Sequence, residues 1–101
     1  MHEILLFTVV DAFMLSGRAG PVLVPGIPQD PALPAMGVGA TLRLALPDGG
    51  SIETAIAGFE RISYGRKVPR AKVCTPISLP AGVPKERIAP GTGVYLVVGK
   101  A

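Results

Sequence analysis

Residues that could do catalytic or metal chemistry are few in this chain and stand far apart. His2 is the sole histidine and Cys74 the sole cysteine, so one chain cannot assemble the usual nitrogen and sulfur ligands of a zinc site. His2 also lies beside the first methionine, where chain ends fray, which makes it a poor general base. Cys74 would lack a histidine base as a nucleophile, and its apolar neighbours favour a small core residue. We therefore expect neither a metal nor another cofactor.

The carboxylates form no pair with the arrangement of a general acid and base. Asp11 differs from the others because it interrupts the apolar run of residues 4–15, where an ionised group must find donors or face water. We predict that Asp11 bonds to backbone amides of a loop, with acid-base chemistry as the alternative. No glycine-rich loop ends in Lys-Ser or Lys-Thr, so we expect no GTP binding by this chain alone. The chain is therefore predicted not to be an enzyme.

Basic residues concentrate in one stretch. The formal charge is +3, and five of the ten Lys and Arg residues lie in positions 61–72 with no acidic residue among them. Clustered cations can follow a phosphate backbone, and an aromatic ring can stack on a base. The stretch is thus a candidate surface for RNA or another anionic partner, with a solvated loop as the alternative. Its candidate residues are Arg61, Tyr64, Arg66, Lys67, Arg70 and Lys72.

Composition indicates what kind of fold must position these residues. A length of 101 residues is room for one domain, residues 1–101, and 49% hydrophobic residues are enough for it to fold. The 13 glycines and 11 prolines break helix interiors, which argues against a helix bundle. The sequence therefore predicts short strands joined by many turns.

Six apolar runs are typical of strands. Alternating leucines in 41–46, the turn 47–50 and the run 51–59 predict a β-hairpin. Prolines in the runs near residues 22 and 76 remove backbone donors, which favours sheet edges or short pieces. Pro84 fits the first turn of a helix that ends after one turn. Six short antiparallel strands indicate a barrel or sandwich. The six runs are 4–15, 22–24, 41–46, 51–59, 72–79 and 93–98.

The compartment is predicted from cysteine usage and the N-terminal run. A single cysteine allows no intrachain disulfide, which favours the cytoplasm. The N-terminal apolar run has no Lys or Arg before Arg18, unlike a signal peptide, and Asp11 leaves it too short to cross a bilayer. We expect no membrane span.

Taken in order, several segments resemble the second domain of translational GTPases of the elongation factor Tu type. Residues 10–18, Val-Asp-Ala-Phe-Met-Leu-Ser-Gly-Arg, are similar to the opening strand and Ser-Gly-Arg turn of that domain. Residues 22–26 and 38–42 resemble its next strand and the entry to the third. Residues 77–79 and 83–93 resemble its penultimate strand and the short helical turn before the last strand. The resemblance extends over residues 4–99.

The resemblance implies a single closed antiparallel β-barrel of six or seven strands, with one short helical turn before the last strand. In that family the barrel packs on a GTPase domain and helps to hold the aminoacylated end of tRNA. Asp11 and Phe13 match positions of the family's binding pocket near the first strand. We therefore expect a stand-alone, non-catalytic β-barrel module that acts through protein or RNA contacts. The alternative is a small RNA- or ribosome-binding protein that uses residues 61–72.

Overall fold

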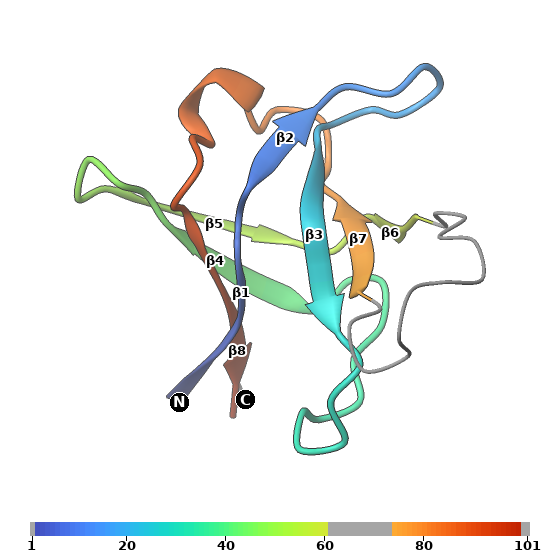
Figure 1. The fold of residues 1–101 in the computed structure, drawn as a ribbon, viewed down its shortest axis with the longest axis vertical. Coiled ribbons are helices and arrows are strands. Elements are labelled where there is room, and N and C mark those ends of the chain that lie inside the picture. The colour runs from blue at the N-terminus through green and yellow to red at the C-terminus, as the bar shows by residue number, and fades with distance from the viewer. Residues whose placement is uncertain (1, 61–73, 100–101) are drawn as a thin grey trace.

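The computed structural model describes residues 2–60 and 74–99, and in these ranges the chain consists almost wholly of β-strands and loops (Figure 1). The helical element there is one 3-10 turn, η2 (Lys85–Arg87), which lies before the last strand. Pro84 precedes the turn in extended backbone, a place where a missing N–H costs nothing. The prediction of an all-β chain with one short helical turn before the last strand is confirmed.

The first sheet is antiparallel and contains the predicted hairpin. Leu42 and Leu44 of the hairpin are completely buried, while Arg43 between them lies on the opposite face. Gly49, with φ of 95°, makes the turn that joins the two hairpin strands. In sheet order the strands are β1 (His2–Thr8), β8 (Gly93–Val98), β4 (Thr41–Ala45) and β5 (Ser51–Ala55).

The second sheet is also antiparallel and has four strands. In sheet order they are β2 (Asp11–Phe13), β3 (Val22–Pro28), β7 (Cys74–Ser78) and β6 (Gly58–Phe59). β3 and β7 make the most extensive contact in this sheet, with Leu23 opposite Ile77. Figure 1 shows β3 and β7 crossing the molecule beside the first sheet, in which the start of β1 lies next to the end of β8.

The N-terminal run passes from the first sheet to the second at a β-bulge. The Val9 N–H donates to the Thr92 carbonyl next to β8, and the Val10 N–H donates to the Val24 carbonyl of β3, both at 2.8 Å. Val24 is also the ladder partner of Asp11, so two residues face one. A bulge bends the strand and increases its twist, so the N-terminal run leaves the first sheet as β1 and enters the second sheet as β2.

The run that follows the hairpin turn makes a second corner of the same kind. The Ile56 N–H donates at 3.0 Å to the carbonyl of Ala40, the residue directly before β4 of the first sheet. The Ala57 N–H donates to the Ser78 carbonyl of β7 at 2.9 Å. Ser78 is also the ladder partner of Gly58. Two of the six predicted runs therefore bend at bulges, and residues 2–60 and 74–99 contain eight strands where the sequence analysis expected six in the chain.

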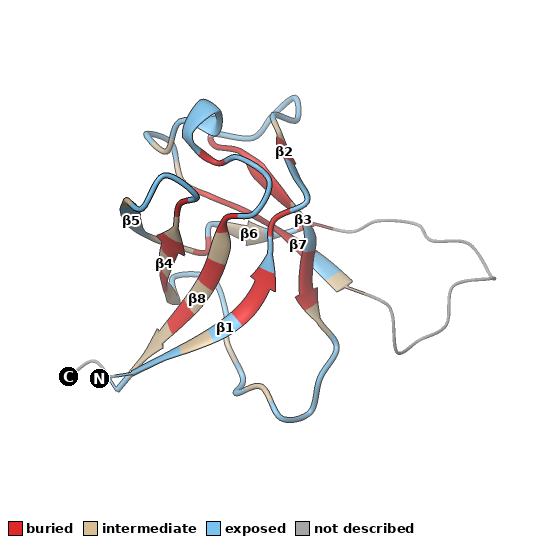
Figure 2. Ribbon diagram, turned by 60° about the vertical axis from the view of Figure 1, so that its left-hand side comes forward, coloured by how far each residue is buried: buried red, intermediate tan, exposed pale blue. Residues whose placement is uncertain are grey.

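Buried side chains of both sheets form one apolar core. Figure 2 shows buried and partly exposed residues alternating along β8, the pattern of a strand with one face inside. Burying each leucine of such a core contributes about 2–3 kcal/mol. The central residues are Leu6, Leu42, Leu44 and Leu96 from the first sheet and Leu23, Ile27 and Ile77 from the second.

The sheet edge expected for the strand that contains Pro76 is wrong for β7, whereas for β3 the structure shows a central strand, which was the alternative to an edge there. Both strands lie inside the second sheet, β3 between β2 and β7, and β7 between β3 and β6. The register shifts between Leu23 and Ile27, so residues 24–26 of β3 face Pro76 alone. The missing donor of Pro25 coincides with this irregularity, whereas Pro76 accepts from the Glu60 N–H at 2.8 Å and cannot donate back to it.

Strand pairing gives two four-stranded sheets. The single closed barrel of six or seven strands that the family resemblance implies is therefore not confirmed.

Candidate binding site

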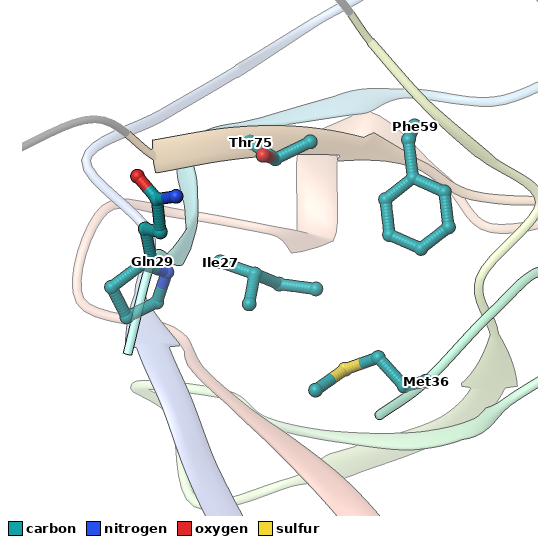
Figure 3. A pocket seen from close by; sticks show the side chains of 6 residues that line it. Ile27, Gln29, Met36, Phe59 and Thr75 are labelled. Atoms are coloured by element: carbon teal, nitrogen blue, oxygen red, sulfur yellow. The ribbon is translucent and has the colours of Figure 1, made fainter. Parts of the chain in front are cut away.

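A pocket of about 360 Å³ opens beside the second sheet (Figure 3). We call it the Phe59 pocket. In Figure 3 the Ile27 side chain lies between Gln29 at one end and Phe59 and Met36 at the other. Phe59 is 40% exposed, so its ring is available to a ligand. The lining residues are Ile27, Pro28, Gln29, Met36, Phe59 and Thr75.

Three strands and one loop place these side chains together. Ile27 of β3 and Thr75 of β7 are ladder partners, which sets both at the same level of the sheet. Phe59 lies on β6 opposite Ile77 of β7. Met36 comes from the proline-rich loop after β3 and packs against the core. The pocket therefore exists only when the register of three strands and the course of the loop are all in place.

The chemistry of the lining suits binding. Four of the six lining residues are apolar, and the polar groups are the Gln29 amide and the Thr75 hydroxyl, each of which can donate and accept hydrogen bonds. The volume lies within the usual range of ligand pockets, roughly 300–1,000 Å³. The lining contains no ionisable residue, so it has no general acid or base. The arrangement can bury an apolar group and orient it through one or two polar contacts.

Asp11 and Phe13, the pocket positions implied by the family resemblance, both lie on β2 and outside the Phe59 pocket. Asp11 is exposed, and its Oδ1 accepts a hydrogen bond from the Ala12 N–H at 2.8 Å. The donor belongs to the strand itself, whereas the sequence analysis predicted a bond to amides of a loop. Phe13 is half-buried and faces Val22 of β3.

The predicted anionic-partner surface lies outside the described residues. Arg61, Tyr64, Arg66, Lys67, Arg70 and Lys72 all belong to the connection 61–73 between β6 and β7. Two residues close to its ends in the sequence, Phe59 and Thr75, line the Phe59 pocket.

A buried carboxylate connects the loop after β2 to the end of β6. Arg18 binds Glu60 with two bonds, Nε to Oε2 at 2.7 Å and Nη2 to Oε1 at 2.8 Å. Glu60 is buried while Arg18 stays 45% exposed. The hydrogen bond from Arg18 lowers the pKa of Glu60, burial opposes this, and the charge of Arg18 and a hydrogen bond from Ser78 lower it further. The pair therefore holds one carboxylate ionised next to the strand that carries Phe59.

A second charge pair lies on the outer face of the first sheet. Arg43 Nε donates to Glu3 Oε2 at 2.6 Å, and the guanidinium stands 4.9 Å from the centroid of the Tyr95 ring. The hydrogen bond from Arg43 lowers the pKa of Glu3. Each charge already has a partner, so this face has the character of a solvated sheet surface.

The two other residues singled out at the start are exposed or half-buried. His2 begins β1 opposite Val98 and is exposed. Cys74, predicted as a core residue, is only partly buried at the start of β7. Among residues 2–60 and 74–99, no three His, Cys, Asp or Glu side chains are grouped to hold a metal ion.

Sequence reasoning missed the pocket residues Gln29, Met36, Phe59 and Thr75. The one available signal was an aromatic residue at the end of the run 51–59, directly before the basic stretch. The exposure of the Phe59 ring depends on the bend at residues 56–57, and no local sequence pattern predicts that bend.

In the part of the chain that is described, no helix has the length and apolar character that crossing a membrane requires. In comparisons with known proteins, no family model, curated protein or solved structure matches this chain.

Proposed function

We propose that this chain is a non-catalytic β-module, similar to the second domain of elongation factor Tu-type GTPases, that binds a protein partner through the Phe59 pocket. The observation that carries the proposal is an apolar pocket of about 360 Å³ with a ring that is 40% exposed. Half-exposed aromatic residues at a concave apolar site are typical anchor points for a partner's side chain. A cytoplasmic location belongs to the same proposal, because a chain with one cysteine needs no oxidising compartment.

The barrel architecture is part of this proposal. We place the two sheets in one closed ring, in which β1 continues as β2 and β5 continues as β6. Support comes from the hydrogen bonds on both sides of each corner, where Val9 and Ile56 bond toward the first sheet and Val10 and Ala57 bond to the second. Shared strands of this kind close a barrel without leaving those edges open.

The binding proposal is tested by NMR titration of ¹⁵N-labelled protein with N-acetyl-leucine methylamide, an uncharged mimic of an apolar side chain. We expect the largest amide shift changes around Ile27, Met36, Phe59 and Thr75. They should change little between low and high salt, because the contact involves no charge.

The matched pair of variants for this titration is Phe59→Ala and Leu5→Ala. Both remove a large apolar side chain that is about half exposed, but only Phe59 lines the pocket. Phe59→Ala should abolish the shift changes and Leu5→Ala should leave them intact. Equal effects of the two changes, or shifts spread over both sheets, would refute the pocket as the binding site.

The second candidate function is RNA or ribosome binding through residues 61–72, and the observation in its favour is the five basic residues in that segment. RNA binding driven by phosphate contacts weakens steeply as salt rises. A titration of fluorescent single-stranded RNA at two ionic strengths should then show strong salt dependence. Changing Arg66, Lys67 and Arg70 to Ala should remove binding, and absence of binding at low salt excludes this candidate.

A further inference from the structure

The Phe59 pocket has an apolar end and a polar end. Figure 3 shows Phe59 and Met36 at one end and Gln29 at the other, with Ile27 and Thr75 between them. The apolar end offers a ring and a thioether, and the polar end offers an amide. A ligand that fills the whole pocket therefore needs an apolar body and a polar tip.

The polar groups of the lining are not used by the fold. Among residues 2–60 and 74–99, the Gln29 amide and the Thr75 hydroxyl have no hydrogen-bond partner. Neighbouring Asp30 differs, because its Oδ1 accepts from the Ala32 N–H at 2.9 Å within the same loop. An apolar ligand that covered the Gln29 amide would take it out of water without a partner, which weakens its binding. The amide therefore selects a ligand that brings a hydrogen-bonding group to this end.

Strand pairing sets the separation of the two ends. Phe59 on β6 is opposite Ile77 of β7. Gln29 directly follows Pro28, which is opposite Cys74 of β7. The two ends are thus two strands apart, about 10 Å across the sheet, and at least three residues apart along it, again about 10 Å. A ligand side chain that contacts both must be long, which a leucine or a valine is not.

Tyrosine is the side chain that meets these conditions. Its ring can pack against Phe59, a contact that is worth more than burial alone, and can touch the Met36 sulfur. Its hydroxyl stands at the far tip of the ring and both donates and accepts, as the Gln29 amide does. Lysine and arginine are long enough, but they carry a charge, and none of the six described lining residues is ionisable.

Given the proposed function, on which this step rests, we infer that the Phe59 pocket accepts a tyrosine side chain of the protein partner. The ring lies against Phe59 and the hydroxyl binds the Gln29 amide. Tyrosine is among the residues that most often anchor protein interfaces, because it buries a large area at a small cost in conformational entropy.

The test is an NMR titration of the ¹⁵N-labelled protein with N-acetyl-tyrosine methylamide and with its phenylalanine and leucine analogues. We expect the dissociation constant to rise from tyrosine through phenylalanine to leucine. Tyrosine should bind about five- to tenfold more tightly than phenylalanine, the effect of one hydrogen bond. Equal affinity for tyrosine and phenylalanine overturns the choice of tyrosine and leaves the pocket as a binding site. Binding of none of the three at the pocket refutes the proposed function as well.

Variants of Gln29 test where the hydroxyl binds. Gln29→Met keeps the length of the side chain and removes the amide, so tyrosine and phenylalanine should bind equally. Gln29→Glu keeps an oxygen acceptor of the same reach and should retain the preference for tyrosine. Position 29 is exposed, so both variants should keep the wild-type pattern of amide signals. A tyrosine preference that survives Gln29→Met contradicts the assigned contact.

The matched control is Glu86→Met, which replaces an exposed polar side chain by methionine in η2, outside the pocket. It should leave all three affinities unchanged. A loss of tyrosine preference in Glu86→Met equal to that in Gln29→Met overturns the assignment of the hydroxyl to Gln29.

Discussion

At the scale of single residues, Glu60 is the charged residue that is buried among the described residues. It is 9% exposed and is bound by both nitrogens of one edge of the Arg18 guanidinium. A carboxylate taken out of water needs such partners to stay ionised. The pair joins segments 42 residues apart in sequence, the loop after β2 and the end of β6.

We predict that Glu60→Gln destabilises the fold in a pH-dependent way. The folded pKa of Glu60 is lowered from its ordinary value of 4.5, so the stabilisation is complete above that value. It is lost as the pH falls through the lower folded pKa. The midpoint of thermal unfolding should therefore drop by a few degrees relative to wild type at pH 7, and the difference should shrink toward pH 3.

The control for this prediction is Glu86→Gln, which changes an exposed carboxylate in η2. It should lower the midpoint little at either pH. A wild-type to Glu60→Gln difference that stays constant between pH 7 and pH 3 contradicts the assigned role of the charge.

At the scale of elements, two glycines let β3 and the loop before it approach β7 and the two residues after it more closely than any side chain allows. A Cβ on Gly26 would overlap the Thr75 carbonyl group and the Pro76 nitrogen, and Gly26 also has φ of 103°. A Cβ on Gly20 would overlap the carbonyl oxygens of Leu79 and Pro80, with no positive φ. Gly39 has φ of 93° but open space around it. Backbone strain and steric overlap are thus separable in this chain.

We predict a graded loss of stability for the corresponding alanine variants. Gly39→Ala should cost about 1–2 kcal/mol through the left-handed backbone alone. Gly20→Ala should cost about 1–3 kcal/mol or more through overlap with backbone that cannot move aside. Gly26→Ala combines both effects and should be the most destabilised. Urea unfolding measures the three values, and a Gly26→Ala variant no worse than Gly39→Ala would show that β7 can shift.

At the scale of the whole molecule, one core serves both sheets, and two bent strands connect them. Leu44 of the first sheet and Ile77 of the second belong to the same buried cluster. The corner residues Val10 and Ala57 carry hydrogen bonds that continue into the second sheet. The proposed closed barrel should unfold as one unit, since opening one sheet exposes the core of the other.

We predict that Leu44→Ala lowers the stability of both sheets equally, by about 2–5 kcal/mol. Native-state hydrogen exchange checks this through the amides of β3, β8 and the corner residues Val10 and Ala57. Leu5→Ala, at a half-exposed position of β1, is the control and should change exchange little. Faster exchange confined to the first sheet would mean that the two sheets open separately and do not form a closed barrel.

Much of the fold was predictable because its determinants are local. Alternating leucines indicated β4, the turn at 47–50 indicated the hairpin, and Pro84 indicated the short turn η2. The candidate site was less predictable. Asp11 stood out because it interrupts an apolar run, and the structure accounts for it by one backbone bond. Phe59 carried only a weak signal, because an aromatic residue at a strand end is equally typical of a core.

By itself the sequence determined that this chain forms short antiparallel strands and a short helical turn before the last of them, because alternation, glycine and proline act within a few residues. Only the tertiary structure decided where two of those strands bend, why β3 and β7 tolerate prolines inside a sheet, and how the Phe59 pocket arises. Each of these depends on partners far away in the chain. A bulge or a vacant donor position exists only once two strands have chosen their register, and that choice minimises the free energy of the whole core.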